Sequence, residues 1–116
     1  MQTYMGGCHC KKVRFEVSLE LKDAIECNCS HCQIKGLLLV FTPLENFTLL
    51  AGEESLTDYR FNKKTIAHLF CNACGVESFG KGKGPDGSET VAVNIRALDN
   101  IDLTSVQRIP FDGKSW

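Results

Sequence analysis

Apolar and polar residues alternate in several parts of the chain, a pattern typical of strands with one buried face. In residues 13–19 the apolar positions are Val13, Phe15, Val17 and Leu19, and the positions between them are polar. Successive side chains of a strand point to opposite faces of its sheet, so this period of two predicts a half-buried strand. No stretch keeps a helical period over three turns, and the chain is therefore predicted to be mainly β.

Apolar runs and turn-forming residues predict the neighbouring elements. Residues 37–42 are predicted to form a fully buried strand, followed by a turn or short helical turn at residues 43–46. Further strands are predicted over residues 56–61, 65–70 and 91–95, with a hairpin turn at 62–64 and a glycine-rich loop at 80–87.

Length and charge limit the classes of function. The chain has 116 residues, the size of one domain, and residues 1–116 are predicted to form a single domain. Thirteen Lys and Arg against fourteen Asp and Glu give a formal net charge of −1, which argues against nucleic acid or an anionic membrane as partner. The longest apolar run, residues 37–41, is too short to span a bilayer, and the first residues lack the features of a secretory signal. We therefore expect a cytoplasmic protein.

The seven cysteines fall into three clusters. They are a first pair of Cys8 and Cys10, a middle cluster of Cys27, Cys29 and Cys32, and a last pair of Cys71 and Cys74. An odd count in a chain without an export signal disfavours a disulfide framework. Cysteines separated by one or two residues are instead well spaced to bind one metal ion, and zinc is favoured because no iron–sulfur spacing is present.

The clusters divide naturally into four ligands and three. Structural zinc sites have four protein ligands, whereas catalytic sites commonly have three and an open position. The last pair needs a second pair, and the first pair is the economical choice because it leaves the middle cluster intact. In the alternative, Cys27 and Cys29 join the last pair, and Cys32 is left with the first pair, which is far away in sequence.

Several motifs join these cysteines into a longer pattern. The motifs are Gly7-Cys8-His9-Cys10, residues 27–32 (Cys-Asn-Cys-Ser-His-Cys), His68-Leu69-Phe70, residues 70–75 (Phe-Cys-Asn-Ala-Cys-Gly) and Val93-Asn94-Ile95-Arg96. With them the chain resembles the GFA family, which is named for glutathione-dependent formaldehyde-activating enzymes and includes centromere protein V-like members. The resemblance extends from residue 6 to about residue 112.

This resemblance implies an Mss4-like fold, a β-sandwich or β-tent with zinc-binding cysteine knuckles and two Zn²⁺ ions per chain. The implied ligands are Cys8, Cys10, Cys71 and Cys74 for a structural zinc, and Cys27, Cys29 and Cys32 for a second zinc, which is catalytic in the founding enzymes. The chain departs from the family in being shorter than those enzymes. It also carries Gln33 where a basic residue is common, and Lys35 is the nearest replacement.

The implied function is that of a zinc-dependent carbon–sulfur lyase acting on glutathione-type thiol adducts of formaldehyde or another small aldehyde. Its partners would be a small-molecule thiol and a small aldehyde. His31 lies inside the middle cluster and is predicted, with the three cysteines, to be catalytic, as a fourth metal ligand or a general base. The alternative for His31 is a loop residue that faces solvent.

Two further hypotheses do not require catalysis. In the first, the chain is a noncatalytic zinc-binding interaction module of Mss4-like fold, and both ions are structural. In the second, the middle cluster senses oxidants, because zinc-bound thiolates can be oxidised with release of the ion.

A few residues outside the cysteines are further candidates. His68 is predicted to be an inner, hydrogen-bonded histidine, and Asn94 to order a loop near the metal. Lys81 and Lys83 are predicted to lie at a solvated hairpin tip, with binding of a substrate carboxylate as the alternative. Trp116 is predicted to pack the terminus against the body of the protein.

Overall fold

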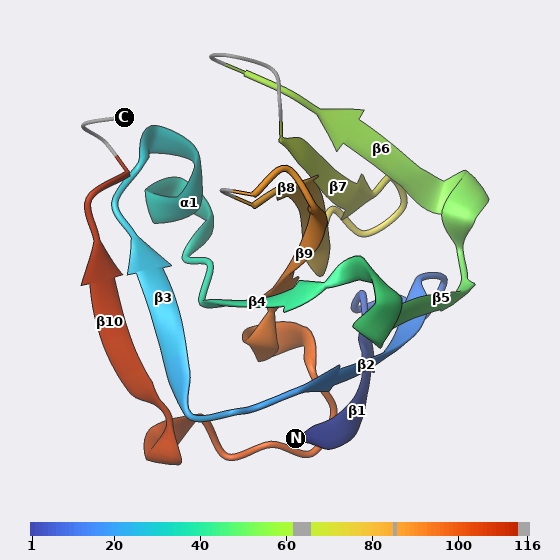
Figure 1. Cartoon of the computed structure of the whole chain (residues 1–116). Helices are drawn as coiled ribbons and strands as arrows, with labels where there is room; N and C mark the ends of the chain where they lie inside the picture. The colour runs from blue at the N-terminus through green and yellow to red at the C-terminus, as the bar shows by residue number, and fades with distance from the viewer. Residues whose placement is uncertain (62–65, 85, 114–116) are drawn as a thin grey trace.

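Two β-sheets and one α-helix make up the part of the chain that the structure, a computed structural model, describes: residues 1–61, 66–84 and 86–113 (Figure 1). The strands are β1 (Gln2–Gly7), β2 (Arg14–Leu19), β3 (Asp23–Cys27), β4 (Leu39–Pro43), β5 (Phe47–Ala51), β6 (Leu56–Tyr59), β7 (Ala67–Cys71), β8 (Phe79–Lys83), β9 (Glu89–Asn94) and β10 (Gln107–Phe111). The helices are α1 (Ser30–Lys35) and the 3₁₀ helices η1 (Leu44–Asn46), η2 (Glu53–Ser55), η3 (Ile95–Ala97) and η4 (Leu103–Ser105). The predicted mainly β class is confirmed. No helix in the described ranges is long and apolar enough to cross a membrane.

The larger sheet gathers strands from the whole length of the chain. Its order is β10-β3-β4-β9-β8-β7-β6, and the smaller sheet has the order β1-β2-β5. All neighbouring strands are antiparallel except β10, which runs parallel to β3. Figure 1 shows β10 and β3 on one side of the molecule and β6 and β7 on the other, with β4 and β9 between them.

Aromatic rings join the two sheets in the core. Phe15, Val17 and Leu19 of β2 are buried, as the alternating pattern predicts, while Glu16 is exposed. The ring centroid of Phe15 lies 5.0 Å from that of Phe47 on β5 and 5.8 Å from that of Phe79 on β8. Since β2 and β5 belong to the small sheet and β8 to the large one, this packing holds the sheets together.

The strand predicted over residues 37–42 is observed in part. It begins later, as β4, and Phe41 is 52% exposed, although Val40 and Thr42 on either side are buried. Complete burial of this strand was therefore a wrong prediction, because Phe41 borders a cavity. The short helical turn predicted at residues 43–46 is confirmed as η1.

The other predicted strands correspond to β6, β7 and β9. The pairing of β6 with β7 is antiparallel, and the hairpin turn predicted between them at residues 62–64 lies outside the described residues. The glycine-rich loop predicted at residues 80–87 is wrong in its first half, because Gly80 and Gly82 belong to β8. A Cβ atom on Gly80 would lie 3.0 Å from the backbone oxygen of Ala67 on β7, so glycine permits the close approach of these strands.

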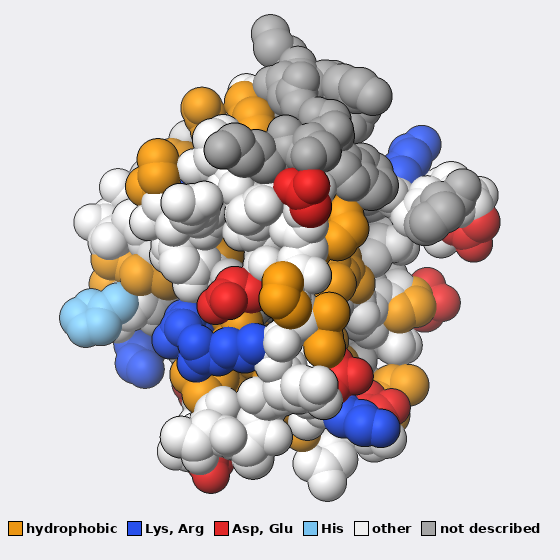
Figure 2. All heavy atoms as spheres, turned by 90° about the vertical axis from the view of Figure 1, so that its left-hand side faces the viewer, with side chains coloured by type: hydrophobic (Ala, Val, Ile, Leu, Met, Phe, Trp, Pro, Cys, Tyr) orange, Lys and Arg blue, Asp and Glu red, His pale blue; other side chains and the backbone are white. Residues whose placement is uncertain are grey.

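β10 extends the large sheet beside β3. The pairing runs from Gln107 opposite Asp23 to Phe111 opposite Cys27. Every residue of β10 is exposed, and Figure 2 shows hydrophobic side chains among charged ones on this side of the molecule. The register brings the end of β10 to the middle cluster of cysteines.

Candidate metal centres and the adjoining cavity

The first and last pairs of cysteines meet in one group. The sulfur atoms of Cys8, Cys10, Cys71 and Cys74 all lie within 4.8 Å of one another. The Sγ atom of Cys10 is 3.6 Å from the Sγ atoms of both Cys8 and Cys71. A tetrahedron with Zn–S distances of about 2.3 Å has S···S edges of about 3.8 Å, so these four soft donors fit a zinc ion.

The turn between β1 and β2 positions the first pair. The backbone N–H of Cys8 donates to the carbonyl of Val13 at 3.1 Å, and the N–H of Val13 donates to Sγ of Cys8 at 3.3 Å. Gly7 precedes this turn, and a Cβ atom there would lie 1.9 Å from the Val13 carbonyl oxygen. Only glycine therefore permits the tight turn that presents these sulfurs.

The last pair lies in the turn that follows β7. The N–H of Ala73 donates to Sγ of Cys71 at 3.4 Å, and Gly75, with a φ of 81°, donates its N–H to the Cys71 carbonyl at 2.8 Å. Backbone N–H donation by Val76 lowers the pKa of Cys74 to about 6. The turn thus favours the thiolate form that a metal ion binds.

The sulfur atoms of the middle cluster form a second group, again within 4.8 Å of one another. Cys27 ends β3, Cys29 is the N-cap of α1, and Cys32 lies in its first turn. The N–H of Cys32 donates to Sγ of Cys29 at 3.3 Å, and the N–H of Cys29 donates to Sγ of Cys27 at 3.4 Å. Three thiols in this arrangement would supply three ligands of a zinc ion and leave a further position open.

Hydrogen bonds and burial act differently on these thiols. Burial opposes ionisation of Cys29, but donation from the Cys32 backbone and the neighbouring thiols lowers its pKa. Burial raises the pKa of Cys32, which lies deeper. In the metal-free protein Cys29 therefore ionises before Cys32.

A cavity of about 930 Å³ adjoins the middle cluster. All three cysteines of the cluster line it, and Arg60, Lys83 and Glu77 are the charged residues in its lining. Its apolar residues are Ile25, Leu37, Leu39, Phe41, Phe61, Ile66, Ala92 and Phe111. Such a cavity has room for an organic molecule much larger than formaldehyde.

His31 takes part in a different cluster from the sulfurs. Its side chain is 9% exposed, so the alternative that it faces solvent is wrong. Its ring centroid lies 4.1 Å from that of His68 and 5.4 Å from that of Phe61, and its Nε2 is 3.2 Å from Oε1 of Glu77. Burial lowers the pKa of His31. His68 is buried, as predicted for an inner histidine.

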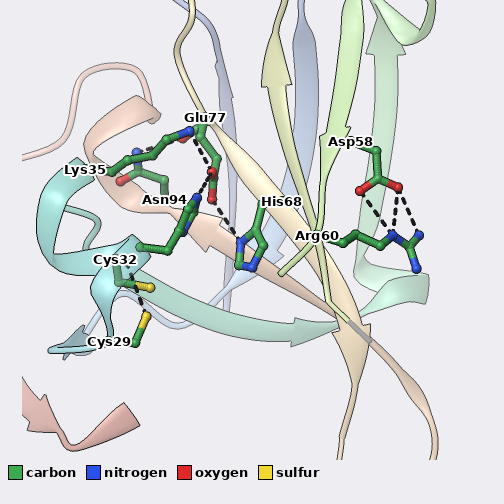
Figure 3. Close-up of polar contacts among 9 residues, drawn as sticks. Cys29, Cys32, Lys35, Asp58, Arg60, His68, Glu77 and Asn94 are labelled. Atoms are coloured by element: carbon green, nitrogen blue, oxygen red, sulfur yellow. Dashed lines mark hydrogen bonds and ion pairs between the residues drawn. The ribbon is translucent and has the colours of Figure 1, made fainter. Parts of the chain in front are cut away.

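Glu77 is a residue of this region that the sequence reasoning missed. Its side chain is 4% exposed, and Figure 3 shows it between Lys35, whose Nζ is 3.0 Å from Oε1, and His68, whose Nδ1 is 3.7 Å from Oε2. Burial disfavours the carboxylate, but the contacts with His68 and Lys35 hold the pKa of Glu77 below its ordinary value. The available signal was a single charged residue within the otherwise uncharged residues 69–80, since such a residue is seldom buried without partners.

Asn94 and Gly113 also support the site. The side chain of Asn94 donates to the backbone carbonyl of Glu77 at 3.0 Å, which agrees with its predicted role in ordering a nearby loop. A Cβ atom on Gly113 would lie 2.4 Å from Sγ of Cys27, so the chain after β10 lies directly against the middle cluster. The sequence reasoning did not identify Gly113, and Trp116, predicted to pack nearby, lies outside the described residues.

The two lysines of the predicted hairpin tip differ in position. Lys81 and Lys83 are both exposed, but Lys83 alone of the two lines the cavity. Arg60 also lines the cavity, and its Nε donates to Oδ2 of Asp58 at 3.0 Å (Figure 3). The cavity therefore combines an apolar interior with two cationic side chains and the carboxylate of Glu77 in its lining.

The class of protein that these features define is a mainly β protein with two groups of cysteine thiols that could each hold a metal ion. The GFA family model, described as "Glutathione-dependent formaldehyde-activating enzyme", matches residues 3–109. The chain therefore belongs to the GFA family. Its fold is similar to the crystal structure of a Rhodobacter sphaeroides protein, with a TM-score of 0.79 and 30% identity over 90% of this chain and 99% of that one.

Proposed function

We propose that this chain is a zinc-dependent, carbon–sulfur lyase-like protein that makes and cleaves glutathione-type thiol adducts of formaldehyde or another small aldehyde. The observation that carries the proposal is the position of Cys27, Cys29 and Cys32 in the lining of an apolar cavity. Family membership supports the same chemistry. A cytoplasmic location, where thiols are kept reduced, agrees with seven free cysteines.

The two cysteine groups would have different tasks. Cys8, Cys10, Cys71 and Cys74 would hold a structural zinc, and the middle cluster would hold the second zinc. That second ion, when bound, supplies Lewis-acid chemistry that lowers the pKa of a thiol. The three thiols keep it at the cavity, where a substrate has access.

The reaction is the addition of a thiol to the carbonyl group of an aldehyde. The thiol sulfur bonds to the carbonyl carbon, the carbonyl π bond breaks, and the thiol proton ends on the new hydroxyl oxygen. Cleavage is the reverse of these steps. The apolar walls, among them Leu37, Leu39 and Phe41, exclude water and limit the orientations of the reactants.

The positive residues in the lining suit a thiol that carries carboxylates. Lys83 and Arg60 would bind such groups through charge-assisted hydrogen bonds. They would take over the task of the basic residue that Gln33 replaces, because Lys35, the nearest replacement in sequence, is paired with Glu77 at 3.0 Å. In this assignment Lys83 and Arg60 determine which thiol binds, and they do not affect the reaction at its sulfur atom.

The test is the interconversion of free formaldehyde and S-hydroxymethylglutathione at equilibrium, followed by NMR exchange spectroscopy with ¹³C-formaldehyde. Zinc-loaded wild-type protein should raise the exchange rate above that of the mixture alone. Cys32→Ser should remove the acceleration while the protein stays folded by circular dichroism. If wild-type protein holds both zinc ions but does not accelerate exchange with any small thiol tested, the proposal is contradicted and a noncatalytic module is favoured.

The lysines of β8 provide a matched comparison. Lys83→Ala should raise the glutathione concentration needed for half-maximal exchange about two- to fivefold, the range of an exposed ion pair. Lys81→Ala should leave it unchanged, because Lys81 does not line the cavity. With 2-mercaptoethanol, which lacks carboxylates, both variants should behave as wild type. Equal effects of Lys83→Ala on both thiols would remove its assigned role.

A further inference from the structure

We infer that His31, His68 and Glu77 form a third metal site, for a divalent first-row transition ion, distinct from both cysteine groups. One ring nitrogen from each histidine and one carboxylate oxygen lie within 4.8 Å of one another. Two imidazoles and a carboxylate are a donor set that suits ions such as Zn²⁺, Co²⁺ and Fe²⁺, whereas Ca²⁺ and Mg²⁺ prefer oxygen ligands. The site does not depend on the thiol chemistry proposed above.

The state of His31 is the strongest reason for a ligand. Its side chain is nine-tenths buried, yet neither ring nitrogen makes a hydrogen bond of good geometry within the described residues. A buried imidazole without a partner is unfavourable, and native proteins seldom leave one. The Nε2 atom lies 3.2 Å from Oε1 of Glu77, so an ion shared by these two groups would give this nitrogen a partner.

The surroundings hold these groups in place. The backbone of Glu77 accepts the hydrogen bond from Asn94, and His68 lies on β7 between Tyr59 of β6 and Gly80 of β8 in the sheet. The ring of Tyr59 stacks on His31 at a centroid distance of 5.8 Å, and that of Phe61 stacks on His68 at 5.1 Å. Ligands fixed by packing and hydrogen bonds lose little freedom when they bind an ion.

The remaining coordination positions would face the cavity. His68 and Glu77 line it, as do the three cysteines of the middle cluster. Aromatic rings cover the side of His31. An ion here would therefore meet the same bound molecule as an ion held by the middle cluster, from a different part of the cavity wall.

Lys35 provides the competing explanation. Its ammonium lies 3.0 Å from Oε1 of Glu77, and a simple ion pair with two neighbouring histidines would need no metal. The two explanations predict opposite effects of removing the lysine. If Glu77 is only an ion-pair partner, removing Lys35 leaves its carboxylate unpaired. If Glu77 binds a metal ion, the same change removes a positive charge that repels the ion.

Zinc binding followed by ¹⁵N NMR of the imidazole rings tests the site directly. The chain has three histidines, and the exposed His9 serves as an internal control. Zn²⁺ added beyond what the cysteines bind should move the ring nitrogen signals of His31 and His68 to metal-bound positions and leave those of His9 unbound. Elemental analysis should show one more ion per chain in wild type than in Glu77→Gln or His68→Phe. Unchanged His31 and His68 signals, or equal metal content in all three proteins, would overturn the inference.

Lys35→Met keeps the inference testable if the variants of the buried residues do not fold. Lys35 is exposed, so its replacement leaves the core intact. We expect Lys35→Met to bind the additional Zn²⁺ at least severalfold more tightly than wild type, and Lys81→Met, a control away from the site, to bind it as wild type does. No gain in affinity for Lys35→Met would show that Glu77 is only an ion-pair partner.

Discussion

Gly7 permits a close approach of the backbone to Val13 in the turn that carries Cys8. At Gly7 a Cβ atom would meet the Val13 carbonyl at 1.9 Å, whereas at Gly82 the nearest atom would be 3.5 Å away. We expect Gly7→Ala to lower the free energy of unfolding by about 1–3 kcal/mol, the usual effect of overpacking. Gly82→Ala should have a much smaller effect. Urea denaturation of both zinc-loaded variants measures the difference, and equal midpoints would contradict the role of Gly7.

Gly113 has a local effect on the middle cluster. A methyl group there would lie 2.4 Å from Sγ of Cys27, so Gly113→Ala should weaken metal binding by that cluster. The fold should persist, because the chain at Gly113 lies beyond the last strand. Competition with a chromophoric chelator measures the affinity, with Gly82→Ala as control. Full retention of the second ion in Gly113→Ala would show that the backbone there moves aside freely.

At the level of residues, groups of neighbours in sequence could be predicted, whereas contacts between residues far apart in sequence could not. The three cysteine clusters were visible because their members are neighbours in sequence. The surroundings of His31 were not, because His68 lies on β7 and Glu77 follows that strand, both more than 30 residues away in sequence. A sequence pattern carries no direct trace of such a contact.

Elements with a regular burial pattern were predicted well. β2 alternates strictly, but β10 is exposed throughout and has no alternation to detect. α1 has only six residues, too few for a helical period, and its N-cap is a cysteine rather than one of the usual capping residues. The sequence predicts a loop over most of β8 because glycines are uncommon in strands. The close approach of β7 explains Gly80, whereas Gly82 has room for a Cβ atom.

Asn94 connects two elements near the site. Its side-chain N–H donates to the Glu77 carbonyl, and its Oδ1 accepts from the N–H of Arg96 at the start of η3. Asn94→Asp keeps the acceptor but loses the donor, so it should lower the free energy of unfolding by about 1–3 kcal/mol, the effect of an unsatisfied buried group. Chemical denaturation checks this value. Wild-type stability of Asn94→Asp would mean that the Glu77 carbonyl needs no donor.

For the whole molecule, the cysteine groups differ in what they connect. Cys8 and Cys10 follow β1 of the small sheet, and Cys71 ends β7 of the large one, so an ion between them would tie the sheets together. Cys74→Ser should therefore lower the melting temperature strongly, because metal binding contributes directly to folding. Cys32→Ser should release the second ion and leave a folded protein. Metal analysis with thermal unfolding separates these outcomes, and equal destabilisation would indicate two structural sites.

The parallel pairing of β10 with β3 also has a consequence for biosynthesis. β3 leaves the ribosome early, but its outer edge stays unpaired until residues 107–111 have been translated. Phe111 and Gly113, which line the cavity, emerge at the same late moment. The nascent chain therefore carries reactive thiols beside an incomplete wall until residues 107–111 have been made, and metal loading of the middle cluster in that interval would occur on an open, solvent-exposed surface.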